Sequence, residues 1–184
     1  LITMSYHGVP TGVQLPESFP RIGMRFVLDK ACEQAVWYGR GPLETYPDCK
    51  EGNAIGCWEK KVEDFYFPYV LPQETGNHED TRWAAFVTEA GNGICIASDK
   101  EFSFGALHYT QENLTQATHT NELHRTENIQ LSVDYAQHGL GSASWGAECL
   151  EKDKLYPEPF TFTWKIFGTE KESLAERAEQ YRRK

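Results

Sequence analysis

The sequence is poor in basic side chains and has no long hydrophobic run. Its 184 residues include 27 acidic and 18 basic side chains, which gives a formal net charge of −9. Affinity for a nucleic-acid backbone comes from clustered Lys and Arg, so this balance argues against a nucleic-acid partner. No apolar run approaches the roughly 20 residues that a membrane span requires. The sequence therefore predicts a protein that binds neither nucleic acid nor membrane.

The sequence also lacks the cysteine and histidine spacings of a disulfide framework or a metal site. An odd number of scattered cysteines without a C-x-x-C pair favours reduced thiols, and with them a cytoplasmic location. His119 and His124, with Glu122 between them, have a spacing that does not place them on one helical face. We expect no metal site in this chain. The five cysteines are Cys32, Cys49, Cys57, Cys95 and Cys149.

The length fits one domain, residues 1–184, with enough apolar and aromatic side chains for a core. The chain begins with Leu1 and its first ten residues contain no basic, apolar leader pattern. We expect it to be a fragment of a longer protein.

Short alternating or β-branched and aromatic stretches are typical of strands. The clearest of them places Phe160, Phe162, Trp164 and Ile166 on one face, so it predicts a half-buried strand. The Gly-Asn-Gly turn within 90–93 predicts an antiparallel hairpin. The expected strands are 24–28, 35–38, 82–89, 93–98, 102–110, 129–135 and 160–168.

Helical signals are few. Thr110 precedes residues 111–118 and Thr120 opens residues 120–125, and each Thr can cap a short helix. At the C-terminus, Leu174, Ala178 and Tyr181 recur at intervals of four and three, which predicts an amphipathic helix capped near Ser173. The pattern as a whole predicts an all-β, antiparallel sandwich with long loops and a short C-terminal helix.

Residues 37–52 form a loop in which Pro42 and Pro47 restrict the backbone. Glu44 and Asp48 in this loop have two interpretations. They either support a site or accept backbone N–H bonds that hold the loop in place.

Residues 64–83 place a polar cluster after four aromatic side chains. A carboxylate such as Glu74 near His78 and Arg82 could serve acid–base chemistry, because neighbouring charges shift pKa values. The structural alternative is an ion pair between Arg82 and a nearby carboxylate.

Trp145 stands among Gly, Ser and Ala residues in 139–149. An indole covers roughly 150–250 Å² when it packs, and such small neighbours cannot bury it. It therefore serves either as a platform for the C–H face of a sugar or as a contact for another domain.

Four ordered motifs resemble the small-chain domain of the β-galactosidases of glycoside hydrolase family 2. LPESFPRIGMRF is similar to its strand entry, and WYGRGPLETYPD resembles its W-x-G-x-G-P-x-E-x-Y-x-D signature. YFPYVLPQETGNHEDTRW and GLGSASWG resemble two further motifs of the family. The resemblance covers residues 20–168 and leaves 169–184 as a C-terminal helix.

The resemblance implies a galactose-mutarotase-like supersandwich that lacks strands on its N-terminal side. It implies that Trp145 binds substrate on the leaving-sugar or acceptor side, supported by loop residues of which the candidates are Glu44, Asp48, Glu74, His78 and Arg82. Retaining glycosidases need two carboxyl groups about 5–5.5 Å apart, and the resemblance places both in a catalytic portion outside this chain. Mg²⁺ and Na⁺ are likewise expected in the complete enzyme, as is a homo-oligomer, and the chain alone is expected to be inactive.

Two alternatives remain. One is a stand-alone carbohydrate-binding module. The other is an aldose 1-epimerase-like enzyme, in which His78 with Glu74 or Glu44 would have to supply the general acid and base.

Overall fold

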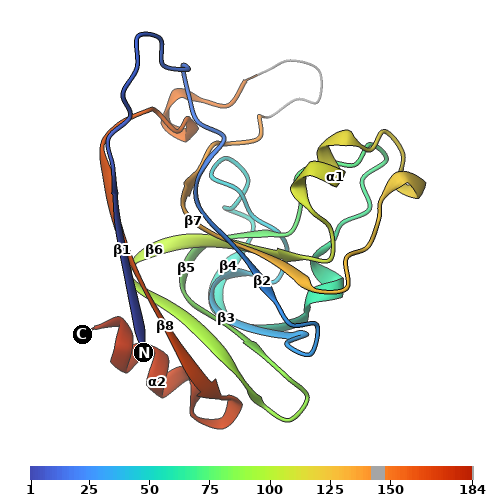
Figure 1. The fold of residues 1–184 in the computed structure, drawn as a ribbon, viewed down its shortest axis with the longest axis vertical. Helices are drawn as coiled ribbons and strands as arrows, with labels where there is room; N and C mark the ends of the chain where they lie inside the picture. The colour runs from blue at the N-terminus through green and yellow to red at the C-terminus, as the bar shows by residue number, and fades with distance from the viewer. Residues whose placement is uncertain (142–147, 184) are drawn as a thin grey trace.

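The computed structural model describes residues 1–141 and 148–183 and shows an antiparallel β-fold (Figure 1). Its eight described strands belong to one branched sheet, and every pairing between them is antiparallel. This confirms the all-β prediction. The strands are β1 (Ile2–Gly8), β2 (Arg21–Leu28), β3 (Gln34–Gly41), β4 (Ala54–Lys61), β5 (Asn77–Val87), β6 (Asn92–Leu107), β7 (Ile129–Gln137) and β8 (Phe160–Glu170).

Two α-helices and four short 3-10 helices complete the described elements. The helices are α1 (Gln111–Gln116) and α2 (Leu174–Arg182), and the 3-10 segments are Val62–Phe65, Thr120–Glu122, Glu151–Asp153 and Lys171–Ser173.

β6 is the strand on which the sheet branches. One edge pairs with β5, while the other pairs with β8 as far as Ala97 and with β7 from Ser103 onward. The sequence predicts two strands here, 93–98 and 102–110, because charged residues interrupt the apolar pattern between them. The backbone instead continues through this interruption as one 16-residue strand. The prediction of two strands was therefore wrong.

The main core lies between the branches of this sheet. Trp37 and Trp164 from one branch and Leu131 from the other belong to the same buried cluster, and all three are at most 1% exposed. The rings of Phe162 and Trp164 lie 5.1 Å apart, with an edge-on orientation that aromatic pairs favour. The half-buried strand predicted at 160–168 is thus confirmed.

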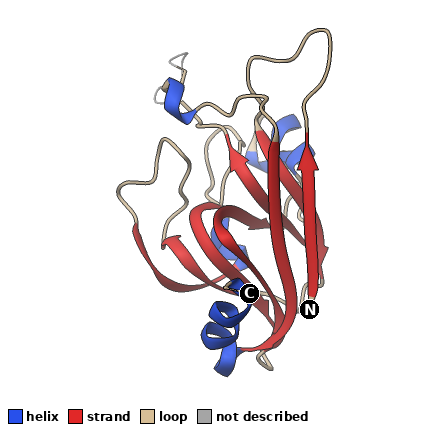
Figure 2. Ribbon diagram, turned by 90° about the vertical axis from the view of Figure 1, so that its left-hand side faces the viewer, coloured by secondary structure: helices blue, strands red, loops and turns tan. Residues whose placement is uncertain are grey.

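The second face of β5 and β6 is covered by α2, which also packs on β8 (Figure 2). Leu174 and Ala178 of α2 are buried against Trp83 and Phe167. The predicted C-terminal helix is present, but Ser173 makes no side-chain capping bond. A 3-10 turn precedes the helix instead, so the capping prediction was wrong.

The turn between β5 and β6 and the cap of α1 were predicted correctly, because each depends on residues that are adjacent in the sequence. Gly91 has φ +85° in the turn between β5 and β6, as the hairpin prediction requires. The Thr110 hydroxyl caps α1 by accepting from the Asn113 amide at 3.1 Å. Residues 120–125, in contrast, form only the 3-10 turn at 120–122.

β1 and β4 were not predicted. β1 pairs with β8 along the left side of Figure 1, and β4 pairs with β3. Alternate residues of both strands are exposed, and β4 contains Gly56 and three charged residues, so neither carries a strong strand signal. Their positions come from the partners that they pair with.

Candidate functional site

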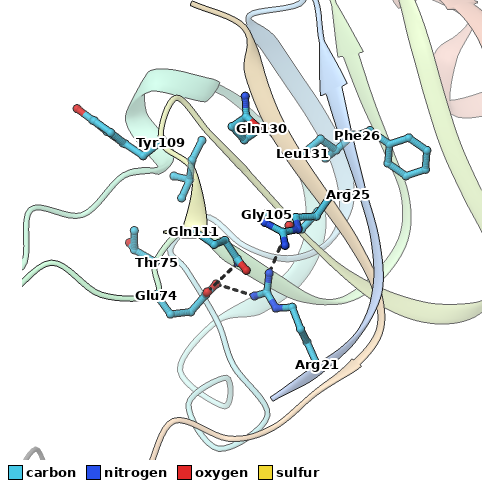
Figure 3. Close-up of a pocket in the computed structure, with 12 residues that line it drawn as sticks. Arg21, Arg25, Phe26, Glu74, Thr75, Gly105, Tyr109, Gln111, Gln130 and Leu131 are labelled. Atoms are coloured by element: carbon cyan, nitrogen blue, oxygen red, sulfur yellow. Dashed lines mark hydrogen bonds and ion pairs between the residues drawn. The ribbon is translucent and has the colours of Figure 1, made fainter. Parts of the chain in front are cut away.

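Loops from four parts of the chain meet at one end of the sheet and border a groove of about 540 Å³. We call it the Arg21 groove. Its lining comes from residues 18–21, Glu74, α1 and residues 137–140. Figure 3 shows the adjoining cavity, which shares Arg21, Glu74 and Gln111 with the groove, and shows these side chains converging from separate elements.

Arg21 and Glu74 form the charged floor of the groove. The Arg21 Nη2 atom donates to Glu74 Oε1 at 2.8 Å, and Nη1 donates to the Ser132 hydroxyl at 3.3 Å. Gln111 Nε2 donates to the other Glu74 oxygen at 3.1 Å. Asp134 Oδ2 lies 3.8 Å from Arg21 Nη1, so one guanidinium faces two carboxyl groups.

Burial controls the protonation of these two carboxyl groups. It raises the pKa of Glu74, and the Arg21 charge offsets only part of this rise. It raises the pKa of Asp134 to about 6, against the same opposing charge of Arg21. A proton is therefore held more tightly here than by an exposed carboxyl group.

A chain of buried amides joins the groove to the start of β5. Gln137 Nε2 donates to Asp134 Oδ2 at 2.9 Å and to Asn77 Oδ1 at 2.8 Å. Asn77 in turn donates to Glu79 Oε1 at 2.9 Å. Burial raises the pKa of Glu79 to about 7. These contacts join β7 to β5 through side chains alone.

Glu44 and Asp48 hold neighbouring loops by accepting backbone bonds. Glu44 Oε2 accepts from the Gly76 amide and the Thr75 hydroxyl, both at 2.7 Å. Asp48 accepts from the amides of Leu140 at 3.0 Å and Gly141 at 2.7 Å. The structural interpretation of these two carboxylates is therefore confirmed, and their support of a sugar site stays a prediction.

His78 lies in the core, away from the groove. Its ring is 1% exposed and contacts the rings of Trp37, Phe65 and Phe104. Its Nδ1 bonds to the Gly76 carbonyl at 3.2 Å, and its Nε2 has no hydrogen-bond partner among the residues the structure describes. Burial lowers the pKa of His78 to about 3, so the ring is neutral near pH 7. This position does not suit the acid–base role that an epimerase would require.

Arg82 pairs with Glu101, and its guanidinium lies over the Tyr38 ring. This is the structural ion pair expected from the sequence, although the partner is on β6 rather than within 64–83. Among the five supporting residues, the structure brings Glu44, Asp48 and Glu74 to the groove end and leaves His78 and Arg82 elsewhere.

Trp145 lies outside the described residues, so its predicted role as a sugar platform is not tested. The nearest described residues before it, Leu140 and Gly141, are those whose amides Asp48 holds.

Arg21 and Gln137 are the groove residues that the sequence analysis missed. Arg21 was noted only as part of a strand entry, and Gln137 follows an alternating strand without any motif. Their cross-strand register, Arg21 opposite Gln137, became visible only with the pairing of β2 and β7.

Metal-ligating side chains do not gather in groups of three or more in residues 1–141 and 148–183. Glu122 instead accepts from the Thr118 amide at 2.7 Å and pairs with His119 at 3.5 Å. All five cysteines are described and are free. No helix in the described ranges is long and apolar enough to cross a membrane.

Taken together, the fold and its groove define an antiparallel β-domain whose loops collect polar side chains at one end. Residues 2–166 match the family described as β-galactosidase small chain, and the chain belongs to this family. The match begins at residue 2, whereas the motifs extend only from residue 20. The earlier start includes β1, which pairs with β8 along its whole length.

Curated relatives agree with this assignment. The chain is 34% identical over 147 residues to a β-galactosidase of Staphylococcus xylosus, covering 80% of the chain and 15% of that protein. It is 35% identical over 158 residues to a β-galactosidase of Kluyveromyces lactis, covering 85% of the chain and 15% of that protein. A match of 35% over 158 residues links it to β-galactosidase BgaC of Bifidobacterium adolescentis. The chain thus spans about 15% of the length of these relatives.

Proposed function

We propose that this chain is the C-terminal segment of a β-galactosidase-like enzyme that hydrolyses terminal β-galactosides. It completes the sugar site on the leaving-sugar or acceptor side and stabilises the assembly. The catalytic carboxylates belong to the portion of the enzyme outside this chain, as do Mg²⁺ and Na⁺. The complete enzyme is a cytoplasmic homo-oligomer.

The observation that carries the proposal is the contact of Asp48 with two consecutive amides. A carboxylate that accepts two N–H bonds fixes the backbone at Leu140 and Gly141, immediately before the segment that contains Trp145. Asp48 belongs to one motif shared with the family and Trp145 to another. This contact, together with the family match, supports a role in positioning rather than in bond breaking.

The test is Trp145→Ala in the complete enzyme, with Trp145→Phe as the control that keeps an aromatic face. We expect the alanine variant to lose the dependence of product partitioning on an added glucose acceptor, while hydrolysis of a nitrophenyl galactoside changes little. An unchanged acceptor dependence would contradict the assignment of Trp145.

A second candidate function, a carbohydrate-binding module, is favoured by the Arg21 groove, because Arg21, Glu74 and Gln111 in its lining can bond to sugar hydroxyls. Titration of the isolated chain with galactose and lactose, followed by tryptophan fluorescence, separates the two functions. Saturable binding that Trp145→Ala abolishes would favour the module. Binding that requires the catalytic portion would favour the segment of an enzyme.

A further inference from the structure

The ion pair on the floor of the Arg21 groove has hydrogen-bonding capacity to spare. A guanidinium has five N–H donors, and the described contacts of Arg21 use one on Glu74 and one on Ser132. A carboxylate has about four acceptor sites, and the contacts of Glu74 use two of them, for Arg21 and Gln111. The two side chains are 18% and 29% exposed, so both reach the open groove.

The charge balance of the groove selects the class of ligand. One guanidinium faces the carboxyl groups of Glu74 and Asp134, so the cluster has no surplus positive charge for an anion. The amides of Gln111 and Gln137 add neutral polar groups beside it. Adjacent donors and acceptors without net positive charge suit a neutral ligand whose groups both donate and accept, as sugar hydroxyls do.

The groove also has a suitable size and place. Its volume of about 540 Å³ lies within the roughly 300–1,000 Å³ of small-molecule sites. Gly139 and Leu140 form part of its wall, and the Leu140 amide is bonded to Asp48. The groove therefore adjoins the backbone on which the proposed function depends.

We propose that Arg21 and Glu74 bind hydroxyl groups of the leaving sugar of a β-galactoside in the Arg21 groove. This inference rests on the proposed function and adds to it the residues that distinguish a sugar leaving group from other leaving groups. Gln111 holds the Glu74 carboxylate in place for this contact.

The test compares two substrates of the complete enzyme that share the galactosyl group. Lactose has a sugar leaving group, whereas o-nitrophenyl β-galactoside has an aromatic one without sugar hydroxyls. Arg21→Lys keeps the charge but loses the planar arrangement of N–H donors. We expect KM for lactose to rise about tenfold, because this is the effect of losing one hydrogen bond to a charged group. We expect KM for the nitrophenyl substrate to change less than about twofold.

Two further variants separate binding from folding. Arg40→Lys changes an arginine of similar exposure, 16%, that is bonded to Asp80 outside the groove, and both KM values should stay within about twofold of the unmodified enzyme. Thr115→Trp introduces a large side chain at an exposed groove position of α1 and should raise only the lactose KM.

Three results overturn the inference. Equal changes with both substrates in Arg21→Lys would assign Arg21 a purely structural role. No change with either substrate in Arg21→Lys and Thr115→Trp would show that the groove does not contact the leaving sugar. An unmodified enzyme that hydrolyses neither galactoside would instead refute the proposed function, and the inference with it.

Discussion

Two arginine–carboxylate pairs in this domain differ in what surrounds them. Arg40 and Asp80 are joined by a 2.6 Å bond, and Lys50 adds a second cation at 2.7 Å from the same carboxylate. Arg21 and Glu74 have almost the same arginine exposure, but here the arginine lies between two carboxyl groups. Asp80 thus pairs with two cations, whereas Arg21 faces two carboxyl groups.

The pKa directions of the two carboxylates follow this difference. Burial acts to raise the pKa of Asp80, yet the hydrogen bonds from Lys50 and Arg40 hold it below its usual value. In Glu74 burial prevails over Arg21, and the pKa is raised. The cations around Asp80 therefore favour its ionised form, whereas burial favours the protonated form of Glu74.

Asp80→Asn tests this comparison with the largest expected effect. Asn also tolerates the positive φ of 50° at this position, so the substitution removes the charge without adding backbone strain. It removes the carboxylate that pairs with both Lys50 and Arg40 and leaves Arg40 with the more distant, exposed Glu51 at 4.0 Å. We expect a loss of about 3 kcal/mol in the free energy of unfolding. Glu74→Gln should cost less than about 1 kcal/mol. Urea unfolding of both variants provides the measurement, and equal losses would remove the distinction.

Glu79→Gln tests the neighbouring carboxyl group, whose pKa is raised to about 7 by burial. A carboxyl group with a raised folded-state pKa binds its proton more tightly in the folded chain than in the unfolded chain. Its ionisation therefore lowers the free energy of unfolding, an effect that is absent below about pH 4.5 and nearly complete above about pH 7. The unmodified chain should therefore lose roughly 3 kcal/mol relative to Glu79→Gln between pH 4.5 and 7.5. Thermal unfolding across this range is the measurement. Parallel pH profiles would show that Glu79 titrates normally.

Asp48→Asn should cost about 1 kcal/mol, because two bonds to backbone amides weaken when the acceptor loses its charge. Hydrogen exchange of the Leu140 and Gly141 amides is the direct measurement. We expect faster exchange at these two amides and unchanged exchange at Gly76, which Glu44 holds. Uniform acceleration across all three would indicate general loosening instead.

The sequence revealed the parts of the fold that depend on local patterns. The alternation around Trp164 and the Gly-Asn-Gly turn identified β8 and the β5–β6 hairpin correctly. β1 and β4 carry weak patterns, and their pairing depends on distant partners. The continuity of β6 was hidden because pairing with β5 maintains the strand where the apolar pattern stops.

The site was predictable to a similar extent. Glu44 and Asp48 were identified from turn chemistry, and Glu74 from its motif, but Arg21 is 53 positions away from Glu74 in the chain. Nothing in the spacing indicates that contact. His78 appeared reactive beside charged residues in the sequence, yet the alternation of β5 directs it into the aromatic core.

The pairing of β1 with β8 has a consequence for how the chain folds. Ser5 and Thr163 are 158 positions apart, yet their hydroxyls lie 2.8 Å from each other. Contacts between residues so distant in the chain form slowly, because a long loop must close first. During synthesis the first strand must wait until almost the whole domain has left the ribosome, so this edge of the sheet is completed last. Until then β1 has no strand to pair with, and the nascent domain presents an open strand to its surroundings.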